Sequence, residues 1–446
     1  MSAIVIGGGL GGLLTARGLR ARGFDVTVVE ASDRLGGQIH TTEFCGMPVD
    51  VGAEAMFLGA PALRELVTDL GLLNEVVGPR SGTSWLQAGR KLTKLPEGVG
   101  PTGPTKLAPV VSSGLLNPAE LARAGMEPAM ARKITEDISV GDFLSGRFGR
   151  AVAEKFLDPV LGNLHAGDVF QLSLHATAPQ LRPTAEQGTS ILKSPRRAPS
   201  AGGAPLFATF ARGMDRLTEA LVADLRAKGV EIFCDTRVTS LTREQNRWVV
   251  NATSGYQAAD HVILTAGASN IDLIAPHFPR AAEPLAATEL ASVATVILAY
   301  PREAIGPQVL DANGVLLTSR SGRLLKAATF LSRKWEHLDG SDVFCIRASV
   351  GRAGSDVLEV IEDEQIASRV HRDLTEVMDI TARPIATRVT RWPHTYPQLR
   401  VGHLDRIGAA RSALAGTGLF VGASAVDGLG LPSVVRSADA LAAAVM

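Results

Sequence analysis

Residues 3–19 read AIVIGGGLGGLLTARGL, and this stretch decides the fold. The first four residues fit a buried strand, the glycines fit a tight turn, and the apolar residues after them fit a helix. Within the turn, Gly7, Gly9 and Gly12 have the G-x-G-x-x-G spacing of a dinucleotide fingerprint. The first glycine allows the turn, the second lets backbone approach a pyrophosphate, and the third lets helix pack against strand. The phosphates then lie at the helix N-terminus, where free N–H groups favour negative charge.

An acidic residue follows where this fingerprint requires one. A strand predicted over 25–29 ends at Glu30, near the ~20-residue spacing of the acid that binds a ribose hydroxyl. Ordinary structural glycines remain the alternative for residues 7–12 taken alone. The continuation EASDRLGG at 30–37 adds Arg34 and the pair Gly36-Gly37. This extension resembles that of FAD-dependent amine oxidases and their relatives, and it implies FAD rather than NAD.

Length and composition exclude several classes of function. The 446 residues predict two or three domains. Lysine plus arginine equals aspartate plus glutamate, at 45 each, so the chain has no net positive charge that would attract nucleic acid. The scattered Cys45, Cys234 and Cys345 fit a reducing cytoplasm, and we expect each to be a small buried apolar residue. The N-terminus shows no export signal and no apolar run of about 18 residues occurs, which leaves only peripheral contact with the inner face of a membrane open.

The patterns predict an α/β protein with a discontinuous Rossmann-like domain. Strands at 230–233 and 262–267, a helix at 215–228 and a strand at 418–422 return to the first domain. Strand candidates between 294 and 390, with one helix at 363–378, predict an antiparallel sheet in a second domain. The domains expected are 1–84, 206–285 and 401–446 for the cofactor, 85–205 as a helical domain, and 286–400 as a sheet domain.

The helical segment 85–205 has several predicted parts. A hairpin over 85–96 leaves the nucleotide domain, and helices follow at 140–148 and 151–160. Prolines and glycines punctuate 96–128 and break regular elements. That stretch is either a surface excursion or a substrate-entry flap that touches lipid. Residues 188–205, with basic residues from Lys193 to Arg197, fit a solvated loop.

A second glycine turn, DGLGLPS at 427–433, opens the C-terminal helix predicted over 434–445. Its N–H groups and positive helix end suit the negative charge that develops at the flavin N1/O2 locus. An ordinary helix start is the alternative. Because this role needs backbone rather than side chains, glycine and proline suffice there.

Several segments together resemble the HemY-type porphyrinogen oxidases, which are oxygen-dependent protoporphyrinogen and coproporphyrinogen III oxidases. The matching segments lie at 91–98, 139–149, 166–174, 178–181, 213–214, 391–403 and 427–432. The resemblance implies a para-hydroxybenzoate-hydroxylase-like fold in which a helical domain lines the porphyrinogen cavity. It also implies noncovalent FAD and removal of six electrons from the macrocycle in three steps, with oxygen reduced to peroxide. A downstream heme-pathway enzyme would receive the product.

The residues expected to bind FAD come from every piece of the first domain. They are Gly7, Gly9, Gly11, Gly12, Glu30, Ala31, Arg34, Gly36, Gly37, Gly52, Ala53, Glu54, Val238, Gly267, Gly422, Gly428, Gly430, Leu431 and Pro432. The role of residues 52–54, an acidic-glycine turn that brings backbone under the cofactor, rests on the resemblance.

No side chain stands out as an obligatory acid or base. The candidate substrate contacts are His165, Gly167, Arg347 and Arg391, with Lys193 as a further cation for propionates. A histidine or arginine without such a role is the alternative at each position, and packing is the expectation for His403. Where related oxidases carry basic residues, this chain has Gly59, Ala60 and Ser84, so carboxylate recognition does not transfer from those positions.

We expect a coproporphyrinogen III oxidase, with a protoporphyrinogen IX oxidase second. A flavin amine oxidase is the alternative from another class. Those enzymes use C-terminal tyrosines above the flavin or tether it through cysteine, whereas here no tyrosine follows Tyr396 and no cysteine follows Cys345. A noncatalytic porphyrin carrier is disfavoured by a dinucleotide site at both ends of the chain.

Overall fold

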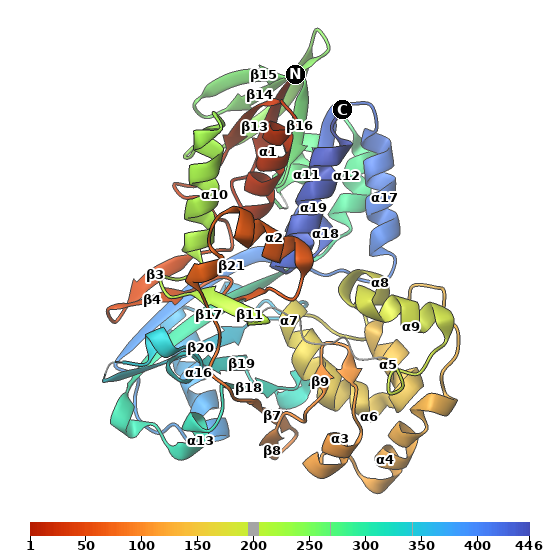
Figure 1. The fold of residues 1–446 in the computed structure, drawn as a ribbon, viewed down its shortest axis with the longest axis vertical. Helices are drawn as coiled ribbons and strands as arrows, with labels where there is room; N and C mark the ends of the chain where they lie inside the picture. Colours follow the sequence, from red (N-terminus) through yellow and green to blue (C-terminus); the bar gives the residue numbers. More distant parts are fainter. Residues whose placement is uncertain (195–204, 268, 341) are drawn as a thin grey trace. The chain divides into compact units, whose positions relative to one another are not determined.

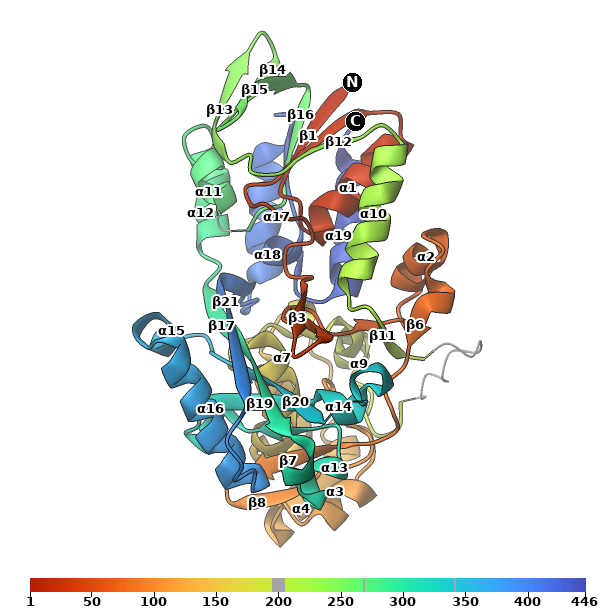
Figure 2. The ribbon, with the colours of Figure 1, turned by 90° about the vertical axis from the view of Figure 1, so that its left-hand side faces the viewer.

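The computed structural model describes residues 1–194, 205–267, 269–340 and 342–446. Contacts divide the chain into two compact units, and both are discontinuous. Unit 1 is Met1–Gly78, Pro199–Glu289 and Leu404–Met446, and unit 2 is Pro79–Ala198 and Leu290–His403. Each unit has its own sheet and its own core (Figures 1 and 2). The division into three domains stays a prediction.

A five-stranded parallel sheet forms the centre of unit 1, with the order β12-β2-β1-β16-β22. Its strands are β1 (Ser2–Ile6), β2 (Asp25–Val29), β12 (Glu231–Phe233), β16 (His261–Leu264) and β22 (Leu419–Val421). Because helices or strands cover both faces, β1 and β16 are buried and apolar along most of their length. The strands predicted for this domain are therefore present.

Helices cover both faces of this parallel sheet. One face carries α1 (Leu10–Ala21), α10 (Asp215–Ala227) and α19 (Leu431–Ala444), which pack on Val5, Val28 and Ile263. The other carries α11 (Ser269–Ile274), α12 (Pro279–Ala286) and α17 (His403–Leu414), which pack on Ile4, Val262 and Leu264. The alternation of buried residues along β1 and β16 thus supplies both cores.

Smaller sheets complete unit 1. One sheet has β13 (Val238–Glu244), β14 (Arg247–Ala252) and β15 (Gly255–Ala259), and a second has β3 (Thr41–Phe44) and β4 (Met47–Asp50). A third has β5 (Met56–Phe57), β11 (Phe207–Phe210) and β6 (Val76–Val77). The helices α2 (Pro61–Asp69) and α18 (Ser424–Asp427) both contact α19. The prediction that each cysteine is buried holds for Cys345, Cys234 is only partly buried, and the prediction is wrong for Cys45. It is exposed because it forms the β3–β4 turn, at φ +51°.

Unit 2 is built on a seven-stranded sheet with the order β21-β17-β20-β19-β18-β7-β8. Its strands are β7 (Ser84–Ala88), β8 (Lys91–Lys94), β17 (Leu290–Pro301), β18 (Gly314–Leu317), β19 (Leu325–Phe330), β20 (Val343–Val350) and β21 (Ala386–Pro397). The apolar side of α16 (Asp363–Met378) packs against one face. The predicted antiparallel sheet and its late helix are present. The predicted hairpin β7–β8 is present. It does not stand alone as expected, because β7 also pairs in parallel with β18 and so extends this sheet.

The rest of unit 2 is mainly helical around α5 (Val140–Phe148). The helix predicted over 151–160 is present, but most of it is not an α-helix. After the short α6 (Arg150–Val152), residues Ala153–Gly162 (η3) form a π-helix that contains Pro159. Proline has no N–H to donate to the carbonyl four residues back, so the α-helical ladder has no bond at that point. The wider turns lead directly into α7 (Asn163–His165).

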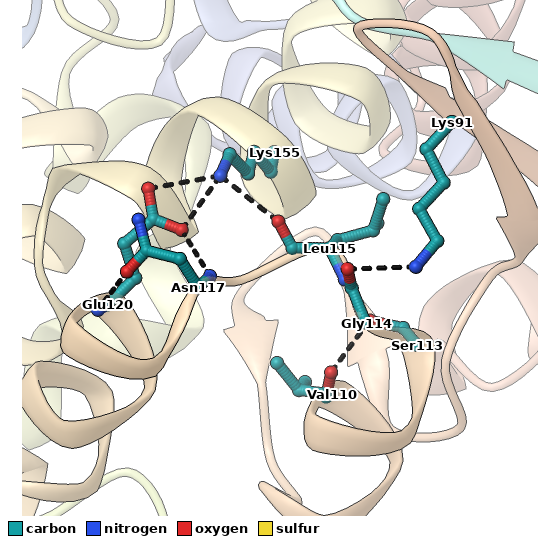
Figure 3. Close-up of polar contacts among 8 residues, drawn as sticks. All are labelled: Lys91, Val110, Ser113, Gly114, Leu115, Asn117, Glu120 and Lys155. Atoms are coloured by element: carbon teal, nitrogen blue, oxygen red, sulfur yellow. Dashed lines mark hydrogen bonds and ion pairs between the residues drawn. The ribbon is translucent and has the colours of Figure 1, made fainter.

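The proline-rich stretch 96–128 is more regular than predicted. It contains α3 (Ala108–Ser113) and α4 (Pro118–Gly125), because its prolines occupy first helical turns, where no N–H is needed. Asn117 and Glu120 form a capping box at the start of α4. Lys155 Nζ binds Glu120 Oε2 at 2.8 Å and the Leu115 carbonyl at 3.0 Å, and Lys91 Nζ binds the Gly114 carbonyl at 2.9 Å (Figure 3). Contact of this stretch with lipid stays a prediction.

The remaining elements are short. They are β9 (Val99–Gly100), β10 (Gly103–Pro104), α8 (Leu174–Thr177), α9 (Arg182–Gln187), α13 (Pro307–Leu310), α14 (Leu331–Lys334), α15 (Val357–Val360) and several single 3₁₀ turns. Of the predicted loop 188–205, residues 195–204 lie outside the described residues. No helix in the described part of the chain combines the length and apolar character needed to cross a bilayer.

Candidate functional site

The glycine turn between β1 and α1 is closely packed at two of its three fingerprint positions. Gly7 has φ +111°, which L side chains rarely adopt. A Cβ on Gly12 would lie 1.9 Å from the Gly7 carbonyl oxygen, so the helix can approach the turn only because residue 12 has no side chain. At Gly9 the nearest described atom would be Gly37 Cα, at 3.8 Å, and φ is −70°. Gly9 therefore leaves open space at the helix N-terminus, as an approaching pyrophosphate requires.

Glu30 follows β2, and its carboxylate lies against the glycine turn. Oε2 accepts a hydrogen bond from the Gly8 N–H at 2.6 Å, and Oε1 accepts one from the Ser32 N–H at 2.9 Å. The Glu30 carbonyl accepts from the Thr236 N–H at 2.8 Å, which brings the start of β13, with Val238, close to this acid along the chain. The carboxylate is thus fixed beside the fingerprint, where a ribose hydroxyl is expected.

Arg34 braces the loop that carries the glycine pair. Its guanidinium donates to the carbonyl oxygens of Leu35 (3.3 Å), Gly37 (2.7 Å) and Ile39 (3.2 Å). The Gly36 N–H in turn donates to the Gly8 carbonyl at 2.9 Å. Arg34 therefore holds residues 35–39 against the glycine turn, and its direct contact with a cofactor stays a prediction, as does that of the exposed Ala31.

The turn at 50–54 is held against the same loop. A Cβ on Gly52 would lie 1.9 Å from the Gln38 carbonyl oxygen, and this oxygen accepts from the Ala53 N–H at 2.8 Å. Asp50 Oδ1 accepts from the Met214 N–H at 2.9 Å. The backbone of residues 52–54, including the half-buried Glu54, is therefore placed next to the glycine-pair loop.

The C-terminal helix α19 runs parallel to α1. A Cβ on Gly11 would lie 3.4 Å from Val434, and one on Gly18 would lie 2.7 Å from Ala442. Contacts at these two levels place both N-termini at the same end of the helix pair. Each helix begins at a glycine, Gly9 or Gly430, whose N-cap position has no side-chain hydrogen bond. The positive ends of two helices thus act on one region.

The carboxyl ends of neighbouring strands converge there as well. Gly267 follows β16 and has φ +52°. Gly422 follows β22, and its N–H donates to the Leu264 carbonyl at 3.2 Å. In α19, Leu431 and Pro432 form the first turn after Gly428 and Gly430, whose φ values are +103° and +93°. Unit 1 therefore brings together predicted residues that are more than 400 positions apart in the sequence.

Two of the predicted substrate contacts lie together in unit 2. His165 is 5% exposed, and its carbonyl accepts from Gln398 Nε2 at 3.0 Å. A Cβ on Gly167 would lie 2.2 Å from Gln398 Oε1, so glycine is needed for this packing. Among the described residues, His165 Nδ1 has no hydrogen-bond partner. Gln398, which is 2% exposed, was not predicted to contact substrate, and it joins the ends of α7 and β21.

The predicted cations differ in their surroundings. Arg347 lies on β20, with Nη2 3.4 Å from the Thr295 hydroxyl. Arg391 Nε binds Asp363 Oδ1 at 2.7 Å, Nη2 donates to the Ile361 carbonyl at 2.7 Å, and Nη1 donates to the Leu358 carbonyl. Arg391 thus holds the start of α16. This structural role accounts for an arginine at position 391 without any contact to substrate. Lys193 lies two residues before the undescribed stretch, and His403 is 1% exposed, in line with packing.

The flavin containing amine oxidoreductase family model matches residues 10–446. The chain belongs to this family. The family uses FAD, and the open space at Gly9, the fixed Glu30 carboxylate and the two uncapped helix ends fit that dinucleotide. The predictions of an FAD enzyme and of its superfamily are confirmed, and the mixed α/β architecture agrees with them. Which side chains touch the cofactor stays a prediction.

Named relatives of similar length extend this family assignment. The chain is 31% identical over 455 residues to the coproporphyrinogen III oxidase of Bacillus subtilis, covering 98% of this chain and 96% of that one. It is 33% identical over 454 residues to the coproporphyrinogen III oxidase of Mycobacterium tuberculosis, covering 98% and 95%. The crystal structure of a candidate protoporphyrinogen oxidase from Exiguobacterium sp. 255-15 superposes with a TM-score of 0.87 at 27% identity, covering 99% and 98%.

Burial of His165 predicts a pH-dependent stability for this oxidoreductase. Desolvation lowers the pKa of His165 from 6.5 to about 4. The unfolded chain therefore binds a proton at His165 more readily than the folded protein does. The free energy of unfolding is highest above pH 6.5 and falls as the pH is lowered to about 4. The expected loss is about 3 kcal/mol. In urea unfolding at several pH values, His165→Gln should lack this part of the pH dependence, whereas His394→Asn, at an exposed histidine, should follow the wild type. Parallel curves for His165→Gln and wild type would contradict the prediction.

Sequence reasoning missed a polar group around α7 and β19. Lys326 is 3% exposed although it is a lysine, and Asn163 Nδ2 donates to its carbonyl at 2.9 Å. Asn163 Oδ1 accepts from Arg352 Nη2 at 2.6 Å. The sequence does carry a signal for Lys326, because it stands inside the apolar run LLKAATF at 324–330.

Proposed function

We propose that this protein is an FAD-dependent coproporphyrinogen III oxidase of heme biosynthesis. The observation that carries the proposal is the similarity to coproporphyrinogen III oxidases, which extends over nearly the whole of this chain and of theirs. The geometry of unit 1 supports it, since the glycine turn and two helix N-termini suit a dinucleotide with a reactive ring. The para-hydroxybenzoate-hydroxylase-like arrangement, with 85–205 and 286–400 on the substrate side, is part of this proposal.

The proposed reaction removes six electrons and six hydrogens from coproporphyrinogen III, while three O2 become three H2O2. FAD, when bound, supplies a hydride acceptor. The chain supplies positioning and a fixed field, because the uncapped N-termini of α1 and α19 stabilise negative charge near them. His165 is neutral at physiological pH, so it presents an uncharged imidazole to any group beside Nδ1.

Turnover of the two porphyrinogens tests the proposed substrate. Anaerobically prepared coproporphyrinogen III and protoporphyrinogen IX are mixed with the FAD-loaded protein in air, and porphyrin fluorescence is followed. We expect kcat/KM to be at least about tenfold higher for coproporphyrinogen III, with about three peroxides per porphyrin from the electron balance. Faster oxidation of protoporphyrinogen IX would overturn the choice of substrate and leave the reaction class intact.

Protoporphyrinogen IX oxidation is the second candidate, and the similarity to the Exiguobacterium structure favours it. An amine oxidase is the candidate from another class, since the family model takes its name from that reaction. Peroxide formation from amines without porphyrinogen would establish that activity instead. A downstream heme-pathway enzyme and a membrane surface remain predicted partners that coprecipitation and vesicle flotation test.

A further inference from the structure

Lys326 occupies an irregular position in the unit 2 sheet. The ladder between β19 and β20 pairs Leu325 with Val350 and Ala327 with Ser349, so Lys326 is the extra residue of a β-bulge. A bulge interrupts the alternation of side chains and re-aims the one it carries. The position is 3% exposed, and a lysine is rarely buried so deeply without an anionic partner.

The charges around Lys326 are mainly positive. Burial, followed by the charges of Arg352 and Arg347, lowers the pKa of Lys326 to about 7, and no carboxylate acts in the opposite direction. No hydrogen bond to its ammonium group is found among the described residues. One acid in this region is Asp158 on η3, whose charge acts on Arg352 and whose Oδ2 accepts from the Ser319 N–H at 2.7 Å. Asp158 therefore acts on Arg352, whereas Lys326 has two neighbouring cations and no anionic partner among the described residues.

Unpaired polar atoms lie around the same group. Arg352 Nη1 and His165 Nδ1 are buried without hydrogen-bond partners in the described part of the chain. The two are linked by backbone, because the Ala353 N–H donates to the Ala166 carbonyl at 2.8 Å. Asn163 fixes the arrangement, since its side chain bonds both Arg352 and the Lys326 carbonyl. Arg352 Nη1 and the Lys326 ammonium group therefore have no hydrogen-bond acceptor in the described part of the chain.

We propose that Lys326 and Arg352 form a binding site for a carboxylate of a tetrapyrrole substrate. This inference rests on the proposed function and names the residues that recognise the substrate's acidic side chains. A buried ammonium without a counter-charge costs several kcal/mol, so a residue needed only to fill space would be more favourable as methionine. An incoming carboxylate supplies the missing charge, pairs with guanidinium donors, and restores the protonated form of Lys326.

Binding of coproporphyrin III, the stable oxidised tetracarboxylate, provides a test that needs no turnover. The FAD-loaded wild type, Lys326→Met and the exposed control Lys133→Met are titrated with coproporphyrin III and with its tetramethyl ester, using porphyrin fluorescence. We expect Lys326→Met to bind the free acid about tenfold more weakly. Lys133→Met should match the wild type, and the ester should bind all three proteins equally. Equal affinity of wild type and Lys326→Met for the free acid would overturn the proposal.

The protonation of Lys326 gives a second readout. In protein labelled with [13Cε]lysine, the resonance that Lys326→Met lacks should titrate near pH 7 and should shift to a higher pKa with coproporphyrin III. Inorganic phosphate and acetate are the comparison ligands. If either raises the pKa as much as coproporphyrin III does, the site accepts any small anion and its assignment to the substrate is overturned. A pKa unchanged by coproporphyrin III overturns the site itself.

The two proposals fail in different ways. Wild-type turnover of coproporphyrinogen III, together with equal coproporphyrin affinities of wild type and Lys326→Met, would overturn this inference alone. Absent turnover of either porphyrinogen, with the carboxylate-dependent loss of affinity intact, would overturn the proposed oxidase function and support the tetrapyrrole site. Thermal unfolding of Lys326→Met controls for misfolding, and we expect it to melt at or above the wild-type temperature.

Discussion

Replacement of Gly9 by alanine is expected to give a folded protein that has lost its flavin. The backbone at residue 9 has φ −70°, and the added Cβ would be 3.8 Å from its nearest described neighbour, Gly37 Cα. The methyl group therefore fits the protein but enters the space through which a pyrophosphate approaches α1. We expect FAD to bind at least about a hundredfold more weakly, equivalent to ~3 kcal/mol. Flavin absorbance of the purified protein and reconstitution with FAD measure this loss.

Two other glycines serve as comparisons for Gly9→Ala. Gly408 in α17 has open space in the Cβ direction, so Gly408→Ala should keep a full complement of flavin. Gly12→Ala places its Cβ 1.9 Å from the Gly7 carbonyl oxygen and should impair folding itself, as seen by circular dichroism. Undiminished FAD affinity in Gly9→Ala would show that the cofactor phosphates lie elsewhere.

Asn163→Leu is expected to cost ~3–5 kcal/mol of folding free energy, because one side chain holds several elements of unit 2 together. Asn163 Nδ2 lies within hydrogen-bond distance of the carbonyls of Pro159 (2.8 Å), Leu317 (3.0 Å) and Lys326 (2.9 Å), and Oδ1 accepts from Arg352. Leucine has similar volume but leaves these partners unpaired. Urea unfolding followed by tryptophan fluorescence measures the loss, since Trp85 and Trp335 belong to unit 2.

The control for Asn163→Leu is Asn246→Gly. Asn246 is an exposed turn residue at φ +70°, where glycine is tolerated, so stability should change by less than about 0.5 kcal/mol. A cost below about 1 kcal/mol for Asn163→Leu would mean that the π-helix and the strands are held together by apolar packing instead.

The sequence predicts those parts of the site that depend on local chemistry. The strand, the glycine turn and the acid at Glu30 lie within about one βαβ unit, and each has a backbone reason for its residue type. The C-terminal glycine turn is predictable for the same reason. The helices α1 and α19 lie parallel because Gly11 and Gly18 have no side chains and allow close approach. No local sequence pattern predicts this packing.

Long-range pairing explains most of what the sequence did not predict. The parallel pairing of β7 with β18 joins residues more than 200 positions apart, and hairpin signals contain no information about it. Arg391 fits the pattern of a carboxylate-binding cation, but the approach of α16 provides Asp363 as its partner. The bulge at Lys326 likewise depends on the register of β19 against β20, so the burial of this lysine appears only in the folded chain.

The discontinuity of unit 1 has a consequence for biosynthesis. Its parallel sheet takes strands from the beginning, middle and end of the polypeptide, and β22 and α19 lie within residues 419–444. Until the ribosome has translated residues 419–444, the nascent fingerprint already exists but lacks both its edge strand and the helix that lies beside α1. Cofactor loading is therefore expected only after residues 419–444 have been synthesised and have folded, and a truncation that removes them would be as damaging as loss of the glycine turn.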